Sequence, residues 1–192
     1  LCNLLLTPDE GEIYINGKEV RDWDRQQLRT YVGMVFQSAP MITGTARHNL
    51  ELPKKLKGET LTNPEKFMEL VHLEPELLNR EAKELSGGQK QRLSLARTLV
   101  NTPAILLLDE VTSALDRHSS REIEELIVQL NKKNGLTILW VTHDLHQAKR
   151  VGDETWFVKD GKVIEKGLTE KIFHDPEHEE TKKFLSLKRE NV

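Results

Sequence analysis

A short apolar run that ends in two acids constrains the fold of this 192-residue chain more than any other feature. Residues 105–108 read Ile-Leu-Leu-Leu, and Asp109 and Glu110 follow at once. A continuous apolar run of this length is typical of a strand buried on both faces of a parallel sheet. Such a strand delivers its carboxylates to the carboxyl edge of the sheet, where open α/β sheets bind ligands. Taken alone, the pattern also fits a solvated turn.

The two acids are expected to have different tasks. Successive strand residues point to opposite faces of a sheet, so one acid can hold a metal ion while the other addresses a nucleophile. Two flanking segments favour a binding edge over a plain turn. Leu-Ser-Gly-Gly-Gln occupies residues 85–89, ahead of a basic amphipathic helix, and Ser-Ala-Leu-Asp occupies residues 113–116.

These segments resemble the signature, Walker B and D-loop motifs of the ATP-binding-cassette (ABC) ATPases. The resemblance covers nearly the whole chain and is to the ATP-binding subunits of bacterial-type ABC transporters. It implies an α/β fold, with a P-loop NTPase-like, mostly parallel sheet, flanking antiparallel β hairpins and a helical subdomain. It also implies an ATPase core with a β-subdomain at residues 1–37 and 97–192, and a helical subdomain that includes the signature at 38–96.

One element of the family pattern does not occur in the sequence. There is no Gly-x-x-x-x-Gly-Lys-[Ser/Thr] phosphate loop, which supplies the lysine, the hydroxyl for Mg²⁺ and the backbone cradle for the phosphates. The resemblance places residues 1–6 just after this loop, as a continuation of its helix, and implies that roughly 40 residues precede Leu1. The chain is therefore expected to be an ABC ATPase domain without its N-terminal part.

Turn and cap signals divide the remaining sequence into elements. Hairpin turns are predicted at Asn16-Gly17 and Asp160-Gly161. Helices are predicted after Asp24, after Asn63-Pro64 and at Pro75. A longer helix is predicted from about Ser119, capped by Ser119 with Glu122, and carrying a buried face at 123, 126, 127 and 130. Strands are predicted at 31–36 and 136–141.

Four residues take their expected roles from the resemblance. Gln37, at the end of the strand 31–36, matches the Q-loop glutamine, a mobile sensor and oxygen ligand of Mg²⁺. Asp109 would hold Mg²⁺, and Glu110 would polarise the attacking water. His143, in Trp-Val-Thr-His-Asp, matches the switch histidine at the γ-phosphate. A lone glutamine after a strand is more often a solvated loop residue, and a single histidine is usually structural or exposed.

The signature has a structural and a functional interpretation that are compatible. Ser86 followed by Gln89 satisfies the capping-box pattern, which predicts a well-capped helix. Gly87 and Gly88 let a backbone approach closely, and the helix N-terminus offers N–H donors to a phosphate. In the family this motif faces the γ-phosphate of ATP bound by the other protomer. The resemblance thus implies a homodimer with ATP and Mg²⁺, and Asp116 would couple its two sites.

Composition limits the classes of function. A formal net charge of −3 gives no electrostatic case for binding nucleic acid. No apolar run approaches the ~20 residues that a membrane span needs, and no signal peptide is evident. The single cysteine, Cys2, fits a reducing compartment. If the chain serves a membrane process, another polypeptide must therefore supply the membrane part. The resemblance implies that the chain is cytoplasmic and peripheral on the inner face of the cell membrane, with a separate polytopic permease as partner.

Alternatives remain open at this point. A soluble ABC ATPase of repair or translation, or an inactive chain without its phosphate loop, would share these motifs. Residues 38–50 would face the membrane partner by resemblance, although a plain surface loop fits them as well. The 138–144 segment resembles small cassettes of iron or metal exporters, whereas phosphate, amino-acid and lipoprotein systems stay open. His174 and His178 could form a metal pair, but Pro176 lies between them and no third ligand is evident.

Overall fold

The computed structural model describes residues 1–189, without the side chains of residues 134, 188 and 189. It divides into two compact units, Leu1–Val141 and Thr142–Val192. The first unit contains β1 to β5 and α1 to α5, and the second contains α6 to α8 with β6 and β7. No helix in the described part of the chain is both long and apolar enough to cross a membrane.

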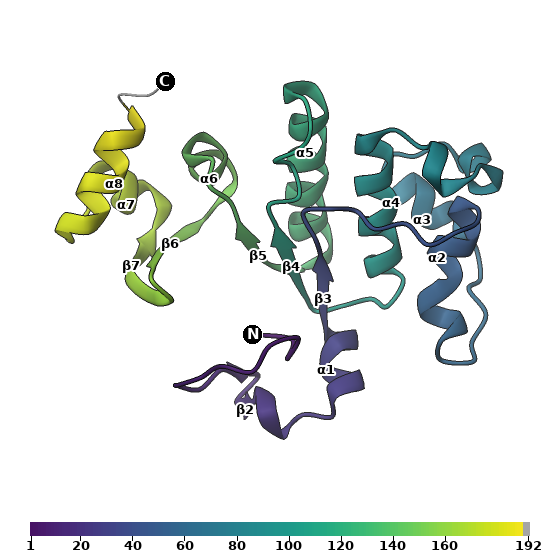
Figure 1. The fold of residues 1–192 in the computed structure, drawn as a ribbon, viewed down its shortest axis with the longest axis horizontal. Coiled ribbons are helices and arrows are strands. Elements are labelled where there is room, and N and C mark those ends of the chain that lie inside the picture. The colour runs from purple at the N-terminus through teal and green to yellow at the C-terminus, as the bar shows by residue number, and fades with distance from the viewer. Residues whose placement is uncertain (190–192) are drawn as a thin grey trace. The chain divides into compact units, whose positions relative to one another are not determined.

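A three-stranded parallel sheet forms the centre of the first unit (Figure 1). Its order is β3 (Val32–Val35), β4 (Ile105–Asp109) and β5 (Thr137–Val141), with β4 in the middle. Because all strands run in the same direction, their carboxyl ends meet at one edge. The predicted buried strand that ends at two acids is thereby confirmed, and β3 and β5 are slightly shorter than predicted.

The two faces of β4 contribute to two different clusters of apolar side chains. Leu106 and Leu108 are buried in the larger cluster, which also contains the apolar faces of α4 and α5. Ile105 and Leu107 pack against the smaller cluster under the N-terminal elements. Each fully buried leucine contributes about 1.5–3 kcal/mol relative to an exposed one, so this short strand anchors both sides of the unit.

β5 has a different environment from β4. Within residues 1–189 it pairs with β4 alone, so its other edge carries no strand. Ile138 and Trp140 pack against the larger cluster, but Leu139 is 39% exposed and Val141 is 54% exposed. The strand thus presents apolar side chains and an unpaired edge of backbone at the same place.

The N-terminal elements form a small antiparallel hairpin and a short helix. β1 (Tyr14–Ile15) and β2 (Lys18–Glu19) pair through the predicted turn, with Asn16 and Gly17 both at positive φ. α1 (Arg25–Tyr31) follows η1 (Val20–Asp22). Its N-cap is Asp24, whose carboxylate accepts a hydrogen bond from the amide of Gln27 at 2.9 Å. The hairpin and the cap are confirmed.

The prediction of a helix through residues 1–6 is wrong. These residues form turns and bends, and Leu4 has a φ of 52° in the left-handed region. The amide of Leu4 donates to the carbonyl oxygen of Leu1 at 2.9 Å, so the stretch closes as a turn in place of the i→i−4 bonds of an α-helix. The apolar composition of this stretch is accounted for by contacts of Cys2 and Leu4 with the smaller cluster.

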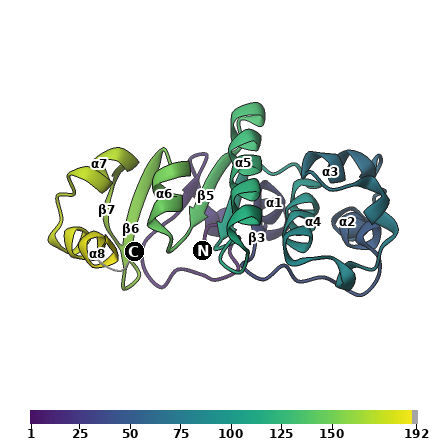
Figure 2. The same cartoon turned by 90° about the horizontal axis from the view of Figure 1, so that it is seen from above.

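Helices occupy most of residues 38–99. They are α2 (Ala46–Lys55), α3 (Pro64–Leu70), η2 (Pro75–Asn79), η3 (Ala82–Glu84) and α4 (Gly87–Leu99). α2 and α3 pack on α4 (Figure 2). Asn63 precedes α3 as predicted, but it adopts the left-handed conformation and its side chain makes no capping hydrogen bond. The assignment of 38–96 to a separate subdomain stays a prediction.

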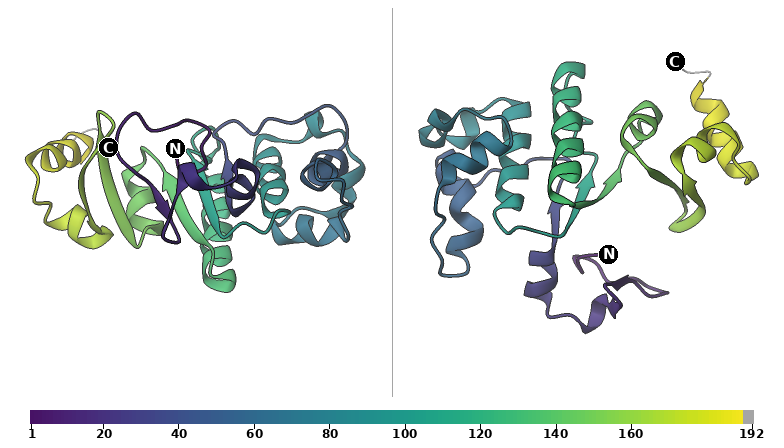
Figure 3. Two further views of the ribbon diagram at one scale, coloured as in Figure 1. Left: turned by 90° about the horizontal axis from the view of Figure 1, so that it is seen from below. Right: turned by 180° about the vertical axis from the view of Figure 1, so that it is seen from behind.

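The long helix α5 (Arg117–Asn134) begins earlier than predicted (the long teal helix in the right-hand view of Figure 3). Asp116 is its N-cap and accepts hydrogen bonds from the amides of His118 and Ser119, so the predicted cap at Ser119 is wrong. A carboxylate at the N-cap satisfies these donors before Ser119 is reached. The predicted buried face is confirmed: Ile123, Leu126, Ile127 and Leu130.

The second unit is built on the predicted hairpin. α6 (Leu145–Val151) leads into β6 (Glu154–Lys159) and β7 (Lys162–Leu168), joined by a turn at Asp160-Gly161 with positive φ at both residues. α7 (Thr169–His174) and α8 (Glu179–Arg189) follow. The rings of Phe157 and Phe184 lie 5.0 Å apart, which places α8 against β6.

The contact between β3 and α4 leaves no room for a side chain at Gly33. A Cβ at this position would lie 2.6 Å from Cγ2 of Thr98 and 3.2 Å from Cγ of Pro103. Thr98 is β-branched and its hydroxyl lies 3.2 Å from the carbonyl oxygen of Met34, so it cannot easily turn aside. We expect Gly33→Ala to lower the free energy of unfolding by about 1–3 kcal/mol, measured by urea denaturation.

The matched control for this change is Thr98→Ser, which removes the crowding methyl group and keeps the hydroxyl. Gly33→Ala should cost clearly less in the Thr98→Ser background than in the wild type. Equal costs in the two backgrounds would show that the clash with Cγ2 is not the cause.

Candidate functional site

The centre of the candidate site is the carboxyl edge of the sheet, where β4 ends. Asp109 is the last strand residue and lies opposite Val141 of β5. Glu110 leaves the strand with a φ of 45°, and its amide donates to the carbonyl oxygen of Val141 at 3.0 Å. The direction of the Glu110 side chain is therefore determined by this backbone turn and not by the alternation of side chains along a strand. A left-handed conformation is costly for glutamate, and such strain concentrates at functional sites.

Gln37 joins the end of β3 to this turn. Its Nε2 donates to Oε2 of Glu110 at 3.3 Å and to Oγ of Ser113 at 3.0 Å. The Ser113 hydroxyl in turn donates to the backbone oxygen of Glu110 at 2.9 Å. The structure thus brings together Gln37 and Glu110, which are far apart in the sequence. Ser113 had not been predicted at the site; its place three residues after Glu110, in a turn, is the signal that could have found it.

The chemistry of these side chains fits a Mg²⁺ ion that is shared with a nucleotide. Magnesium takes oxygen ligands and is usually bound by one or two protein groups plus phosphate oxygens. Asp109 offers a carboxylate, and Gln37 retains its amide oxygen because its Nε2 is engaged. Among the described residues no group of three or more His, Cys, Asp or Glu could hold a metal ion. The described residues could therefore supply some of the oxygen ligands of such an ion, but they form no complete protein cage.

The signature segment forms the N-terminus of α4. Ser86 and Gln89 make the predicted capping box: Oγ of Ser86 accepts from the Gln89 amide at 3.2 Å, and Oε1 of Gln89 accepts from the Ser86 amide at 3.0 Å. A Cβ added to Gly87 would lie 3.6 Å from Leu115, and one added to Gly88 would lie 3.4 Å from Ser119. These are ordinary contacts, so packing within this chain does not require either glycine.

Asp116 lies next to the signature, at the start of α5. The Ser119 hydroxyl donates to its Oδ2 at 2.7 Å, and the amides of Ser119 and His118 donate to its Oδ1. These bonds, that of the Ser119 hydroxyl above all, favour the ionised form and hold the pKa of Asp116 below its usual value. The aspartate predicted to couple two sites is thus a fixed, ionised cap in this chain.

The pH dependence of this cap can be tested. Because the pKa of Asp116 is lower in the folded than in the unfolded state, its stabilising effect is present at neutral pH and is lost as pH falls through the folded pKa. We expect Ser119→Ala to move this loss to higher pH, toward the usual aspartate pKa of about 3.9. A carbon NMR titration of the Asp116 carboxyl group measures the shift. Identical curves for variant and wild type would contradict the role given to Ser119.

His143 belongs to the second unit, where it precedes α6. The next residue, Asp144, caps that helix by accepting hydrogen bonds from the amides of His146 at 2.8 Å and Gln147 at 3.1 Å. The cap fixes the backbone that presents His143. Its predicted position after β5 is confirmed, while its role at a γ-phosphate stays a prediction.

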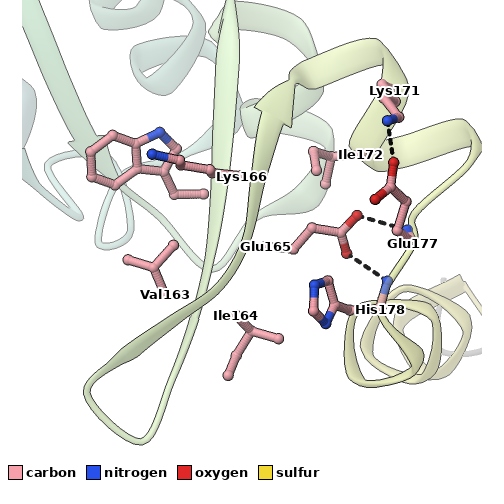
Figure 4. A pocket seen from close by; sticks show the side chains of 9 residues that line it. Val163, Ile164, Glu165, Lys166, Lys171, Ile172, Glu177 and His178 are labelled. Atoms are coloured by element: carbon pink, nitrogen blue, oxygen red, sulfur yellow. Dashed lines mark hydrogen bonds and ion pairs between the residues drawn. The ribbon is translucent and has the colours of Figure 1, made fainter.

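A cavity of about 580 Å³ lies within the second unit, between β7 and the segment around α7 (Figure 4). Burial alone would raise the pKa of Glu165 at its wall, but hydrogen bonds, including those from the amides of Glu177 and His178, hold it below its usual value. None of the predicted site residues lines this cavity. His178 does, but a metal site with His174 finds no support among the described residues.

Comparison with known proteins identifies the family of the chain. Residues 1–113, which include the sheet edge at β4 and the signature, match the family model described as ABC transporter. The chain belongs to the ABC transporter family. The predicted α/β fold class is confirmed as well, because solved ABC cassettes superpose on most of the chain.

Several relatives are ATP-binding proteins of transporters. The protein YjkB of Bacillus subtilis, named among ABC transporter ATP-binding proteins, is 52% identical over 96% of this chain and 74% of its own length. The methionine import ATP-binding protein MetN 2 of Acinetobacter baylyi is 41% identical over 96% of this chain. The chain spans only 56% of that relative. These matches favour the ATPase subunit of a transporter over a soluble ABC ATPase.

Two solved structures of ABC cassettes resemble the chain in fold, and one of them is a dimer. The dimeric cassette MJ0796, in a post-hydrolysis state bound to ADP and Pi, is 34% identical and has a TM-score of 0.74, over 87% of this chain and 77% of its own. The cassette cbiO1 of Clostridium perfringens, part of the transporter complex cbiONQ, is 28% identical with a TM-score of 0.80, over 92% and 73%. The narrower resemblance to metal exporters stays a prediction.

Proposed function

We propose that the chain supplies half of each of two ATP sites in a homodimer, and that ATP hydrolysis there drives transport through a separate membrane permease. The observation that carries this proposal is the network of Gln37, Glu110 and Ser113 at the carboxyl edge of the sheet. It joins the side-chain amide of Gln37 to the carboxylate of Glu110, whose backbone has a φ of 45°. A strained acid bonded to a polar side chain of a neighbouring strand favours a chemical role over a solvated turn.

In the proposed reaction Glu110 acts as the general base. Water attacks the γ-phosphorus of ATP, its proton passes to a carboxylate oxygen of Glu110, and ADP leaves with the bridging oxygen. Gln37 orients that carboxylate, and His143 donates a hydrogen bond to the γ-phosphate. Mg²⁺, held by Asp109 and the Gln37 oxygen, would neutralise charge on the phosphates.

The signature would act on the nucleotide of the other protomer. Ser86, Gly87, Gly88 and Gln89 form a helix N-terminus, where the positive end of the helix dipole and the amides of Gly87 and Gly88 would attract a phosphate. Neither glycine is needed for packing within the chain, which supports a requirement for close approach from outside it. The dimeric state of the related cassette bound to ADP and Pi supports the same arrangement. Asp116 would couple the two sites through the start of α5.

The proposed partner is a polytopic permease at the inner face of the cell membrane, with the chain peripheral and cytoplasmic. The relatives named as transporter subunits support this, as does cbiO1 as part of the cbiONQ complex. Residues 38–50 are the proposed contact. The transported substrate and the direction of transport are left open, because among the relatives named above MetN 2 alone has a name that states them.

Removal of the divalent metal tests the proposed reaction. In the full-length natural protein, chelation of Mg²⁺ is expected to lower ATP turnover by at least about a hundredfold, since charge neutralisation is a main part of phosphoryl transfer. Added Mg²⁺ should restore turnover, and release of phosphate measures it. Turnover that persists at full rate in excess chelator would contradict the proposal. Co-purification of the protein with a soluble partner alone would contradict the proposed permease.

A further inference from the structure

Side chains of the signature helix hold the backbone of the segment that carries Gln37. The Thr98 hydroxyl lies within hydrogen-bond distance of two carbonyl oxygens, that of Met34 at 3.2 Å and that of Ser94 at 3.0 Å. Nε2 of Gln91 donates to the carbonyl oxygen of Phe36 at 3.0 Å, and Nη2 of Arg97 donates to that of Pro40 at 2.9 Å. One helix thus binds residues 34–40 on both sides of Gln37.

Gln91 makes the contact closest to Gln37. It is only 5% exposed, and its acceptor is the carbonyl of the residue immediately before Gln37. Loss of this partner would leave the buried amide of Gln91 without a hydrogen bond, which costs free energy. The contact with the Phe36 carbonyl is therefore favoured. Gln91 also lies two residues after Gln89, in the first turns of α4. Its position is therefore tied to that of the signature.

We infer that Gln91 is a positioning residue, which transmits the position of the signature helix to the hydrogen bond between Gln37 and Glu110. This inference rests on the proposed function, because it concerns how the two parts of that machinery are linked. The connection runs from the N-terminus of α4 through Gln91 to the Phe36 carbonyl, and from there to Gln37 and Glu110.

The physical consequence is a coupling between two sites. A helix is stiff, so a displacement of its N-terminus moves the Gln91 side chain with it. The Phe36 carbonyl follows that displacement, and the reach of Gln37 toward Glu110 changes. Binding of a phosphate at the signature would thereby change the position of Glu110, the general base of the chain's own site. By linkage, binding of a nucleotide at that site would change the affinity of the signature for phosphate by the same free energy.

The first test uses the nucleotide-free, full-length protein and does not depend on activity. Gln91→Leu keeps the volume of the side chain and removes the donor. We expect the carbonyl carbon NMR resonance of Phe36 to move upfield, as that of a carbonyl that loses a hydrogen-bond donor does, and the side-chain amide resonances of Gln37 to move with it. Thr98→Val, whose lost contact is to Met34, should leave these resonances at their wild-type positions. Unchanged Phe36 and Gln37 resonances in Gln91→Leu would overturn the inference.

The second test is a double-mutant cycle on ATP turnover. Gln91→Leu alone should lower kcat roughly three- to tenfold with little change in KM, and it should have no further effect in a Gln37→Ala background. A role in general stability would instead reduce turnover by the same factor in both backgrounds, and that result would overturn the inference. Gln37→Ala with wild-type turnover would refute the role proposed for Gln37, whereas the Phe36 carbonyl resonance would still decide on Gln91.

Discussion

Replacement of Glu110 by glutamine is expected to lower ATP turnover about a hundred- to ten-thousandfold, the range typical of a lost general base. Glutamine has nearly the same shape and retains an oxygen that can accept from Nε2 of Gln37, so the turn after β4 should be preserved. Binding of ATP should therefore stay within a few-fold of wild type. Single-turnover kinetics and equilibrium nucleotide binding, both on the full-length protein, separate the two effects.

The matched control is Glu125→Gln, the same chemical change at an exposed position on α5. It should turn over ATP at the wild-type rate. Wild-type turnover by Glu110→Gln would refute the assignment of Glu110 as the base. Loss of ATP binding together with turnover would show that the carboxylate holds the nucleotide or the fold rather than the attacking water.

The second large effect is expected at Gly87, where a substitution should lower ATP turnover without lowering stability. A Cβ there meets only Leu115, at 3.6 Å, and alanine is a better helix former than glycine. Gly87→Ala should therefore leave the unfolding midpoint in urea unchanged or slightly raised. Turnover should fall about a hundredfold, because a displacement of a bound phosphate by one methyl group is enough to misalign it. A stable variant with normal turnover would refute the proposed close approach.

A mixture of two inactive variants tests whether the signature acts on the partner's nucleotide. If it does, a dimer of one Gly87→Ala chain and one Glu110→Gln chain contains one site with an intact base and an intact signature. Random mixing should then restore about a quarter of wild-type turnover, since half of the dimers are mixed and each keeps one site. No recovery in demonstrably mixed dimers would place signature and base at the same nucleotide within one chain.

Much of the local structure could be predicted because short-range patterns determine it. The capping box at Ser86, the hairpin turn at Asn16-Gly17 and the buried face of α5 depend on residues within one or two turns. The exact start of α5 could not, because Asp116 and Ser119 are both good caps and only the preceding turn decides between them. Residues 1–6 have an apolar composition that fits a helix, but they pack as turns on the smaller cluster.

The site was predictable in its residues and less so in its geometry. The resemblance named Gln37 and Glu110, but their hydrogen bond joins positions 73 residues apart, which no local pattern encodes. The left-handed turn at Glu110 likewise depends on the hydrogen bond from its amide to the carbonyl oxygen of Val141 on another strand. Ser113 enters the network through that turn. The roles assigned to Asp109, His143 and the signature stay predictions, to be decided by the experiments above.

The open edge of β5 has a practical consequence for work on these residues. An unpaired strand that exposes Leu139 and Val141 is a template for strand addition by a second molecule, and therefore a site of aggregation. The protein would gain solubility from a charged residue at this edge, such as Leu139→Lys, which repels further strands. If the edge is covered in the natural assembly, the same substitution would instead impair folding or association.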